Sequence, residues 1–460
     1  MKSKTLFILF PGIAFFYIIA ILGSGCAQIS APTGGPRDSI PPQLLNASPG
    51  LKAVNVKSNK ITFSFNEYIE VQDVQNNVLI SPLPAKTPNI NYKLKTVTVS
   101  LKDTLLPNTT YSINFGNAIK DVNEGNILQN FTYVFSTGNI IDSLMLDGKI
   151  IVAETGKTDS TIVALLYKNA NDSAVYKRKP DYIARPDAGG NFSFNNLSAG
   201  KYKIYALKDG DGNKYYNSKT ELFAFNNEEI TVSSKNEPVT LYAFSEEKDN
   251  KNFSNAKTSP EKTLKYTYTD GKQDLSADFE LTFNNPVKKL EPGKIILTDS
   301  AFTPIANSSI ALDSTHKKVV IKTKWKQAAY YNLIINKDAV ADSANNFLAK
   351  TDTLHFTAKS EADYGNVILR FTSLDITQKP VLQFIQNDVL KMSFSLLSNE
   401  WSMKLFPPGE YDIRILLDAN SNGKWDAGNY SKKIQPERVI VISQKLSVRP
   451  DWDNETDIKL

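Results

Sequence analysis

The chain has 460 residues, and because domains hold roughly 100 to 200 residues each, this length predicts several of them. Lysine and arginine number 53 against 48 aspartates and glutamates, and a net charge of +5 is too dilute for a nucleic-acid-binding surface. One cysteine and two histidines exclude a disulfide framework, iron–sulfur clusters and cysteine-ligated zinc, so we expect neither enzyme activity nor a cofactor, with calcium left open.

The amino terminus has the features of a secretion signal. A basic start precedes an apolar run over residues 6–22, and small residues then lead to Cys26. The run is shorter than the roughly 20 residues that span a bilayer, and a Pro-Gly pair interrupts it. Residues 1–25 therefore predict a cleaved signal peptide, with an uncleaved membrane anchor or an unlipidated signal as the alternatives.

Cys26 and the small residues before it resemble the lipobox of bacterial lipoproteins, whose cysteine is acylated and becomes the first residue of the mature protein. The pattern departs from that family at Gly23, where an apolar residue is preferred. The resemblance implies that Cys26 carries a lipid that binds the membrane. Residues 26–40 are rich in Pro, Gly and small polar residues, which predicts a flexible tether. Because no acidic sorting signal follows Cys26, the resemblance points to the periplasmic face of the outer membrane.

Strand-like alternation dominates the remaining chain, and no segment shows sustained helical periodicity. The first alternating run places Ile61, Phe63 and Phe65 on one face of a strand, and similar short runs follow after turn residues. This spacing of short strands and turns is typical of a β-sandwich. The sequence therefore predicts an all-β fold, with a first sandwich over 41–138.

The same order of features returns about 220 residues later in the chain. A single duplication explains the repeat, and it predicts a second sandwich of the same type over 261–360. The parallel segments are 61–67 with 279–285, 96–99 with 318–321, 111–115 with 331–335, and 118–126 with 339–346.

Residues 41–138 open on a Pro-Pro pair, contain a Phe-Ser-Phe strand at 63–65 and close on Phe-Ser-Thr at 135–137. This pattern is similar to that of the bacterial Ig-like domain first associated with S-layer proteins. The copy at 261–360 lacks the Pro-Pro opening. The resemblance implies Ig-like sandwiches at both places.

A second pattern follows each of these segments. Leu197 begins a Leu-x-x-Gly-x-Tyr run, a similar Gly-x-Tyr run follows Leu405, and an acidic loop comes after each. The runs resemble the transthyretin-like, or carboxypeptidase-regulatory-like, sandwich, and the resemblance implies such modules over 140–245 and 361–460. The two module types then alternate as tandem sandwiches, and the polar segment 246–260 is expected to link the two halves.

The later acidic loop has the spacing of a calcium-binding loop. Oxygen-bearing side chains stand at loop positions 1, 3, 5 and 9, and Gly423 stands at position 6. The glutamate that an EF-hand carries at position 12 is absent, so the site would be weak, and a polar turn closed by Asx-type hydrogen bonds is the alternative. The candidate ligands are Asp418, Asn420, Asn422 and Asp426.

The earlier acidic loop, 209–213, repeats the first three ligands but has Lys214 where the glycine belongs. A lysine is expected to resist the left-handed turn that a glycine adopts. We therefore expect calcium, if it binds either loop, at the later one.

A third pattern is Asp, then Ser or Thr, then a small or apolar residue or Thr, and it occurs nine times. It resembles the O-glycosylation acceptor of secreted Bacteroidetes proteins. The alternative is architectural, because an aspartate followed by a hydroxyl residue is also a common start to a strand after a turn. The candidate acceptors are Ser39, Thr104, Ser143, Ser160, Ser173, Ser300, Ser314, Ser343 and Thr353.

No phosphate-binding loop and no nucleophile elbow is found, and His316 and His355 have no third imidazole or cysteine to form a site with. The leading hypothesis is an outer-membrane-anchored lipoprotein with a non-enzymatic binding, spacer or envelope-scaffold role. Its partners would be the membrane and an envelope protein or glycan, without nucleic acid. The alternatives are a glycan-capture lipoprotein with exposed tryptophans, and an accessory hydrolase with a carboxylate site between modules.

Overall fold

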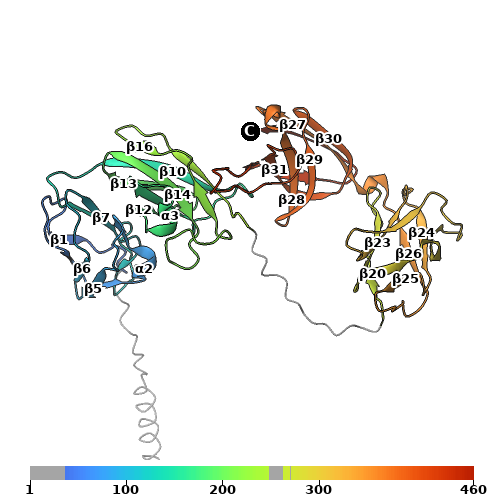
Figure 1. The fold of residues 1–460 in the computed structure, drawn as a ribbon, viewed down its shortest axis with the longest axis horizontal. Coiled ribbons are helices and arrows are strands. Elements are labelled where there is room, and N and C mark those ends of the chain that lie inside the picture. The colour runs from blue at the N-terminus through green and yellow to red at the C-terminus, as the bar shows by residue number, and fades with distance from the viewer. Residues whose placement is uncertain (1–36, 248–262, 270) are drawn as a thin grey trace, which may run out of the picture. The chain divides into compact units, whose positions relative to one another are not determined.

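The computed structural model describes residues 37–247, 263–269 and 271–460, and almost every element in them is a β-strand (Figure 1). The prediction of an all-β fold is confirmed. In these residues no helix has the length and apolarity needed to cross a membrane. The helical segments in them are the four-residue α2 (Val74–Asn77) and α3 (Ala174–Lys177) and the 3-10 turns η1 (Pro292–Lys294), η2 (Glu361–Asp363) and η3 (Ile376–Gln378).

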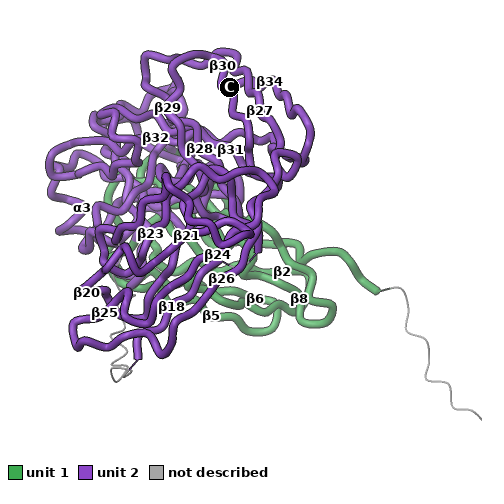
Figure 2. The backbone as a smooth tube through the Cα atoms, turned by 90° about the vertical axis from the view of Figure 1, so that its right-hand side faces the viewer, with its two compact units in different colours: residues 1–80, 84–141 green, residues 81–83, 142–460 purple. Residues whose placement is uncertain are grey.

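The chain divides into two compact units (Figure 2). One holds the described residues up to 80 together with 84–141, and the other holds 81–83 and 142–460. The predicted signal peptide, Cys26 and most of the predicted linker 246–260 lie outside the described residues.

The first sandwich comprises strands β1 to β9. Ile61, Phe63 and Phe65 on β2 are at most 1% exposed, and the residues between them face partly outward, so the predicted alternation builds this core. The sheets run in the orders β1-β2-β6-β5 and β4-β7-β9, with β3 paired to β8. The strands are β1 (Leu44–Ser48), β2 (Lys60–Phe65), β3 (Ile69–Val71), β4 (Leu79–Ser81), β5 (Asn89–Lys93), β6 (Thr96–Ser100), β7 (Thr110–Asn114), β8 (Ile119–Asp121) and β9 (Thr132–Ser136).

The third sandwich, β18 to β26, repeats the first strand for strand. Its sheets run in the orders β18-β19-β23-β22 and β21-β24-β26, with β20 paired to β25. The repeat of strand order agrees with the repeat of features in the sequence, and a duplication as its cause stays a prediction. The strands are β18 (Tyr266–Thr267), β19 (Phe279–Phe283), β20 (Val287–Leu290), β21 (Ile295–Asp299), β22 (Ser309–Leu312), β23 (Lys318–Lys322), β24 (Tyr330–Ile335), β25 (Val340–Asp342) and β26 (Asp352–Thr357).

A buried aspartate marks the same place in both copies. Asp121 ends β8 and Asp342 ends β25, and their carboxylates accept N–H groups of the following loop, up to Asn126 and Asn346, at 2.6 to 2.9 Å. Burial alone would raise the pKa of each carboxyl, but these hydrogen bonds outweigh it and hold the pKa below its usual value. The repeated Asp-to-Asn spacing in the sequence is therefore a loop closure.

The second and fourth sandwiches share a different topology. In the second, the sheets run β13-β10-β17 and β12-β11-β14-β15, with β16 beside β14. The last strand, β17, pairs parallel to the first, β10. The strands are β10 (Leu144–Val152), β11 (Val163–Lys168), β12 (Tyr182–Ala184), β13 (Asn191–Leu197), β14 (Gly200–Leu207), β15 (Phe223–Phe225), β16 (Ile230–Val232) and β17 (Val239–Ala243).

The fourth sandwich has the sheets β30-β27-β34 and β29-β28-β31-β32, with β33 beside β31 and β34 parallel to β27. Its strand order thus matches that of the second, although membership of the transthyretin-like family stays a prediction. The strands are β27 (Gly365–Thr372), β28 (Pro380–Gln386), β29 (Val389–Ser395), β30 (Glu400–Phe406), β31 (Gly409–Leu417), β32 (Arg438–Val441), β33 (Leu446–Val448) and β34 (Asp453–Lys459).

The Gly-x-Tyr pattern has a structural role in both of these sandwiches. Tyr202 on β14 and Tyr411 on β31 are buried in their cores. Each hydroxyl donates a hydrogen bond to a carbonyl four residues earlier, at Ser198 (2.9 Å) and Pro407 (3.1 Å). The tyrosine closes the turn that precedes its own strand, and its polar end is satisfied where the ring is buried.

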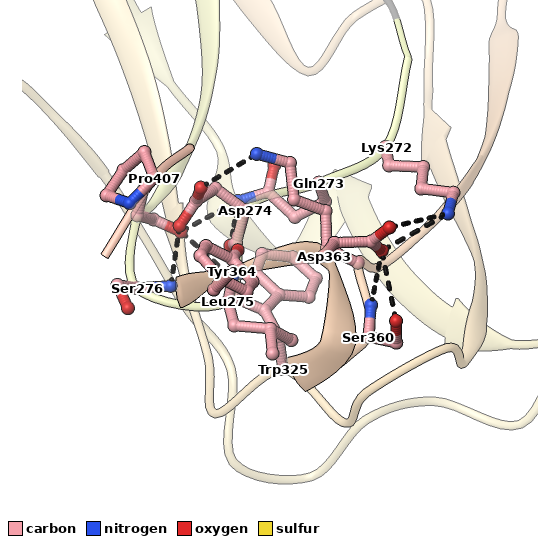
Figure 3. Close-up of polar contacts among 12 residues, drawn as sticks. Lys272, Gln273, Asp274, Leu275, Ser276, Trp325, Ser360, Asp363, Tyr364 and Pro407 are labelled. Carbon is pink, nitrogen blue, oxygen red and sulfur yellow. Dashed lines mark hydrogen bonds and ion pairs between the residues drawn. The ribbon is translucent and has the colours of Figure 1, made fainter. Parts of the chain in front are cut away.

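The third and fourth sandwiches meet at Tyr364, just before β27 (Figure 3). This side chain is 2% exposed, and its hydroxyl accepts the backbone N–H of Leu275 at 2.7 Å. Lys359 lies over the ring at 5.1 Å and pairs with Asp274 at 3.1 Å. One buried ring with its hydrogen bond thus joins the two sandwiches.

Replacing Tyr364 with Phe should remove the acceptor of the Leu275 N–H and keep the ring. An unsatisfied buried amide costs about 1–3 kcal/mol, so we expect the free energy of unfolding to fall by that amount in urea denaturation of the mature chain. Tyr330→Phe is the control, because Tyr330 is 44% exposed and its change should cost less than about 0.5 kcal/mol. Equal effects of the two changes would contradict this role for Tyr364.

Candidate functional site

The later acidic loop, between β31 and β32, closes upon itself. Asn420 and Asn422 turn their amide nitrogens toward Asp426, each 2.6 Å from its Oδ2. Asp418 is 1% exposed, and its two oxygens accept the N–H groups of Asn422 (3.2 Å) and Gly423 (2.7 Å). The four predicted ligands are brought together, but as an Asx-type turn in which their hydrogen bonds satisfy one another. Calcium binding at this loop stays a prediction.

A residue outside the predicted loop completes this closure. Glu437, which directly precedes β32, accepts the N–H of Ala419 at 2.8 Å through Oε1 and the N–H of Asp426 at 3.1 Å through Oε2. Burial and the nearby carboxylates raise the pKa of Glu437. Both oxygens of this glutamate are therefore in use within the loop.

The earlier acidic loop, between β14 and β15, adopts the same turn. Lys214 has φ of 67° and Gly423 has φ of 75°, so the lysine takes the left-handed conformation that the sequence suggested it would resist. That expectation is wrong. The carboxylate of Asp209 compensates for the strain, because its Oδ2 accepts the backbone N–H of Lys214 at 3.2 Å and pairs with Nζ of the same residue at 2.5 Å.

The earlier loop also contains a group of closely spaced carboxylates that the later acidic loop lacks. Asp209, Asp211 and Glu221 each offer an oxygen, and these three oxygens lie within 4.8 Å of one another. The side chain of Asp209 is 4% exposed, and its Oδ1 is buried without a hydrogen-bond partner. Glu221 lies outside the spacing of a calcium-binding loop, and the sequence signal for it is an acidic residue just before the next strand, present here and at Glu437 in the later loop.

Tyr430 of the fourth sandwich is the centre of an aromatic cluster on the second. It lies between β31 and β32, is 2% exposed, and its ring centroid is 5.0 Å from that of Phe225 and 5.1 Å from that of Phe223 on β15. The rings of Tyr176, Tyr205 and Tyr216 complete the cluster. Two sandwiches that lie far apart in the chain therefore share one buried aromatic contact.

The hydroxyl of Tyr430 is satisfied as well. It donates to the carbonyl of Asp172 at 2.8 Å, so the hydroxyl of Tyr205, 3.0 Å away, must donate to Tyr430. Burial raises the pKa of Tyr430, and it raises that of Tyr205 to about 12.

Glu246 connects this joint to the earlier acidic loop. Its Oε1 accepts the backbone N–H of Tyr430 at 3.0 Å and the hydroxyl of Tyr216 at 3.1 Å. Tyr216 belongs to the loop between β14 and β15, and its ring stacks on Phe223 at 4.0 Å. The acidic loop and the joint thus share a residue.

The tryptophans do not form a sugar-binding platform. Trp325 is 7% exposed and belongs to the third core, and Trp401 packs against the fourth core. Trp425 donates its indole N–H to the carbonyl of Glu437 at 2.7 Å. Trp452 is 58% exposed, but the Arg449 guanidinium lies over its ring at 5.4 Å. No cleft with several aromatic faces results from these positions.

The two histidines each face a protein oxygen. His316 Nδ1 lies 3.4 Å from the carbonyl of Val287, and His355 Nδ1 lies 2.6 Å from Oδ1 of Asn332. These contacts agree with a structural role.

The nine predicted acceptor motifs lie mostly at exposed turns. The hydroxyl residue is exposed except at Ser173 and Thr353, which are partly buried. In several motifs the aspartate accepts the N–H two residues later, as Asp299 does from Ala301 at 2.9 Å, so the architectural alternative accounts for the spacing. O-glycosylation stays a prediction for Ser39, Thr104, Ser143, Ser160, Ser173, Ser300, Ser314, Ser343 and Thr353.

Comparison with protein families finds a match over the first sandwich. Residues 38–137 match the model of the bacterial Ig-like domain. The first sandwich is thus similar to a bacterial Ig-like domain. The third sandwich has the strand order of this Ig-like domain, as described above. A search of curated proteins finds no match.

Several solved structures are similar in part. The amino-terminal part of the bacterial S-layer protein SbsC is 16% identical, with 38% of this chain and 42% of that chain covered and a TM-score of 0.16. The major pilin subunit BcpA of Bacillus cereus is 11% identical, with 69% and 99% covered and a TM-score of 0.17. A fragment of alpha-2-macroglobulin from Escherichia coli is 12% identical, with 41% and 94% covered and a TM-score of 0.21. The chain thus spans less than half the length of the S-layer fragment.

Replacing Tyr430 with Ala should loosen the joint between the second and fourth sandwiches. Loss of a buried aromatic ring costs about 3–5 kcal/mol, whereas Tyr430→Phe keeps the ring and should cost about 1 kcal/mol for the lost hydrogen bond. Urea denaturation of the mature chain measures both. Tyr92→Ala, at a tyrosine that is 47% exposed, is the control, and a Tyr430→Ala variant as stable as this control would refute the joint.

Alkaline pH should also weaken this joint. An unfolded tyrosine ionises near pH 10, whereas Tyr205 in the fold stays neutral until about 12. In that window the folded chain holds more protons than the unfolded one, so the free energy of unfolding falls as the pH rises. Urea midpoints measured from pH 8 to 12 should show a steeper fall for the native chain than for Tyr205→Phe. Identical pH profiles would contradict the burial of this hydroxyl.

Proposed function

We propose that the chain is a lipoprotein of the cell envelope, attached through a lipid on Cys26 to the periplasmic face of the outer membrane, and that its sandwiches act as a non-enzymatic scaffold or spacer. The observation that carries the proposal is the pair of buried joints at Tyr364 and Tyr430. Domains joined through buried contacts keep their spacing, which a scaffold needs and which domains on flexible linkers lack.

The bacterial Ig-like domain supports a structural or adhesive role. The polar side chains also support it. Within the described residues, the one group of potential metal ligands close enough to hold an ion is Asp209, Asp211 and Glu221, three carboxylates without a histidine or cysteine among them. Fold alone does not settle activity, so the proposal rests on the buried joints together with these polar groups.

The proposed partners are the membrane, through the lipid, and an envelope protein or glycan. Glycan capture by tryptophans has less support, because Trp452, the most exposed of them, has one face covered by Arg449. An accessory hydrolase would need paired carboxylates in a cleft, and the joint at Tyr430 is lined mainly by aromatic rings.

Replacing Cys26 with Ser should release the protein from the membrane, because the hydroxyl of serine cannot take the place of the acylated thiol. Fractionation of cells that express the full chain should find the native protein in the outer membrane and the variant in the soluble or unprocessed fraction. Ser30→Ala, in the predicted tether, is the matched control and should stay with the membrane.

Mass spectrometry of the native protein tests the same proposal directly. The expected mature chain begins at a lipid-modified Cys26. An intact Met1 together with a free thiol would overturn the anchoring. Digestion of the sandwiches by a protease added to intact cells would overturn the periplasmic placement.

A further inference from the structure

The carboxylate group of the earlier acidic loop has the dimensions of a cation site. The oxygens that Asp209, Asp211 and Glu221 offer lie within 4.8 Å of one another. Two oxygens bound to one calcium ion at 2.3–2.6 Å are at most about 4.6–5.2 Å apart. A single ion centred among the three oxygens would therefore lie at, or slightly beyond, coordination distance from each, and a small movement of the side chains would complete its binding.

A second observation points to a ligand at this place. Oδ1 of Asp209 is buried and has no hydrogen-bond partner, in a side chain that is 4% exposed. A buried carboxylate oxygen without a donor is costly. Asp209 is one of the three carboxylates of the group, and a bound ion would supply the partner that this oxygen lacks.

The net charge of the earlier acidic loop favours a divalent cation. Three carboxylates face one ammonium, that of Lys214, which pairs with Oδ2 of Asp209 and leaves Oδ1 without a partner. The net charge of these three carboxylates and one ammonium is therefore two negative charges.

The later loop is an internal comparison, because it has the same turn without these features. There the oxygens of Asp418 accept the N–H groups of Asn422 and Gly423. Both oxygens of Glu437 accept backbone N–H groups. In the earlier loop both N–H bonds to Glu221 fall on Oε2, from Asn217 at 3.3 Å and Ser218 at 3.2 Å.

We propose that Asp209, Asp211 and Glu221 bind a calcium ion, and that this ion stabilises the joint at Tyr430. Calcium fits better than magnesium, because an irregular set of carboxylate oxygens on a loop suits its flexible coordination. With three carboxylates, we expect the affinity of extracellular modules, a dissociation constant of about 0.1 to 1 mM.

The link from the ion to the joint runs through Tyr216. This residue lies between the ligands Asp211 and Glu221 in the chain, and its hydroxyl donates to Glu246, which also accepts the N–H of Tyr430. An ion that fixes both ends of this segment also fixes Tyr216 between them. Calcium should therefore slow hydrogen exchange at the backbone amide of Tyr430.

The test is a calorimetric and thermal titration of the mature full chain after chelation. Calcium chloride at 10 mM should give binding heat and raise the melting temperature by about 1–4 °C, while magnesium chloride of equal ionic strength should do clearly less. Asp209→Asn, which keeps the shape of the side chain, should weaken calcium binding at least tenfold. Asp418→Asn in the later loop is the matched control and should leave the titration unchanged.

Three outcomes would overturn the site: no heat and no thermal shift at 10 mM calcium, equal binding by the native chain and Asp209→Asn, or loss of binding in Asp418→Asn alone. If circular dichroism shows that Asp209→Asn is misfolded, Asp211→Asn at the exposed ligand replaces it with the same expected loss. Calcium binding without slower exchange at Tyr430 would overturn the link to the joint. None of these results depends on Cys26 or on the membrane.

Discussion

The burial of the Tyr430 ring is the contact on which the arrangement of the larger unit depends. This residue and its partner Tyr205 are 225 positions apart in the chain, and the whole third sandwich lies between them. Bringing such distant segments together costs chain entropy, although the cost grows only slowly with length. A ring packed among five others, with its hydroxyl and its backbone N–H both bonded, offsets that cost. The fourth sandwich therefore contacts both the second and the third.

Apolar burial, more than surface charge, holds these sandwiches together. Most ion pairs of the described residues are partly exposed, as Lys272 with Asp363 is beside the Tyr364 joint, and such pairs contribute little to stability. The aromatic rings at Tyr364 and Tyr430 lose nearly all their contact with water. Because each sandwich also has a core of its own, the joints can change without loss of the individual folds. This separation suits a scaffold, whose geometry lies in its joints.

The two acidic loops have the same backbone turn but differ in how their carboxylates are hydrogen-bonded. Lys214 and Gly423 have nearly the same φ, and in both loops the first aspartate accepts the N–H at this position. The side chains then differ. In the later loop, amides and backbone N–H groups occupy the carboxylates, which makes a closed turn. In the earlier loop, amide and N–H groups also occupy both oxygens of Asp211, but Asp209 keeps one oxygen without a donor beside the other two carboxylates. The two loops share the turn and differ in the chemistry of their side chains.

The sequence by itself determined the all-β fold, the strand repeat and the likeness of the first sandwich to an Ig-like domain, because alternation and repeated turn residues are local features of a chain. It also indicated both acidic loops. Only the tertiary structure decided which of them leaves a buried carboxylate oxygen without a donor, since Glu221 and Glu437 enter from the far end of each loop. The sequence did not indicate the joints either, because nothing in the sequence distinguishes Tyr430 from other loop tyrosines. Its burial depends on contact with the second sandwich. Contacts between residues that are distant in the chain leave no periodic pattern, so folding alone brings them together.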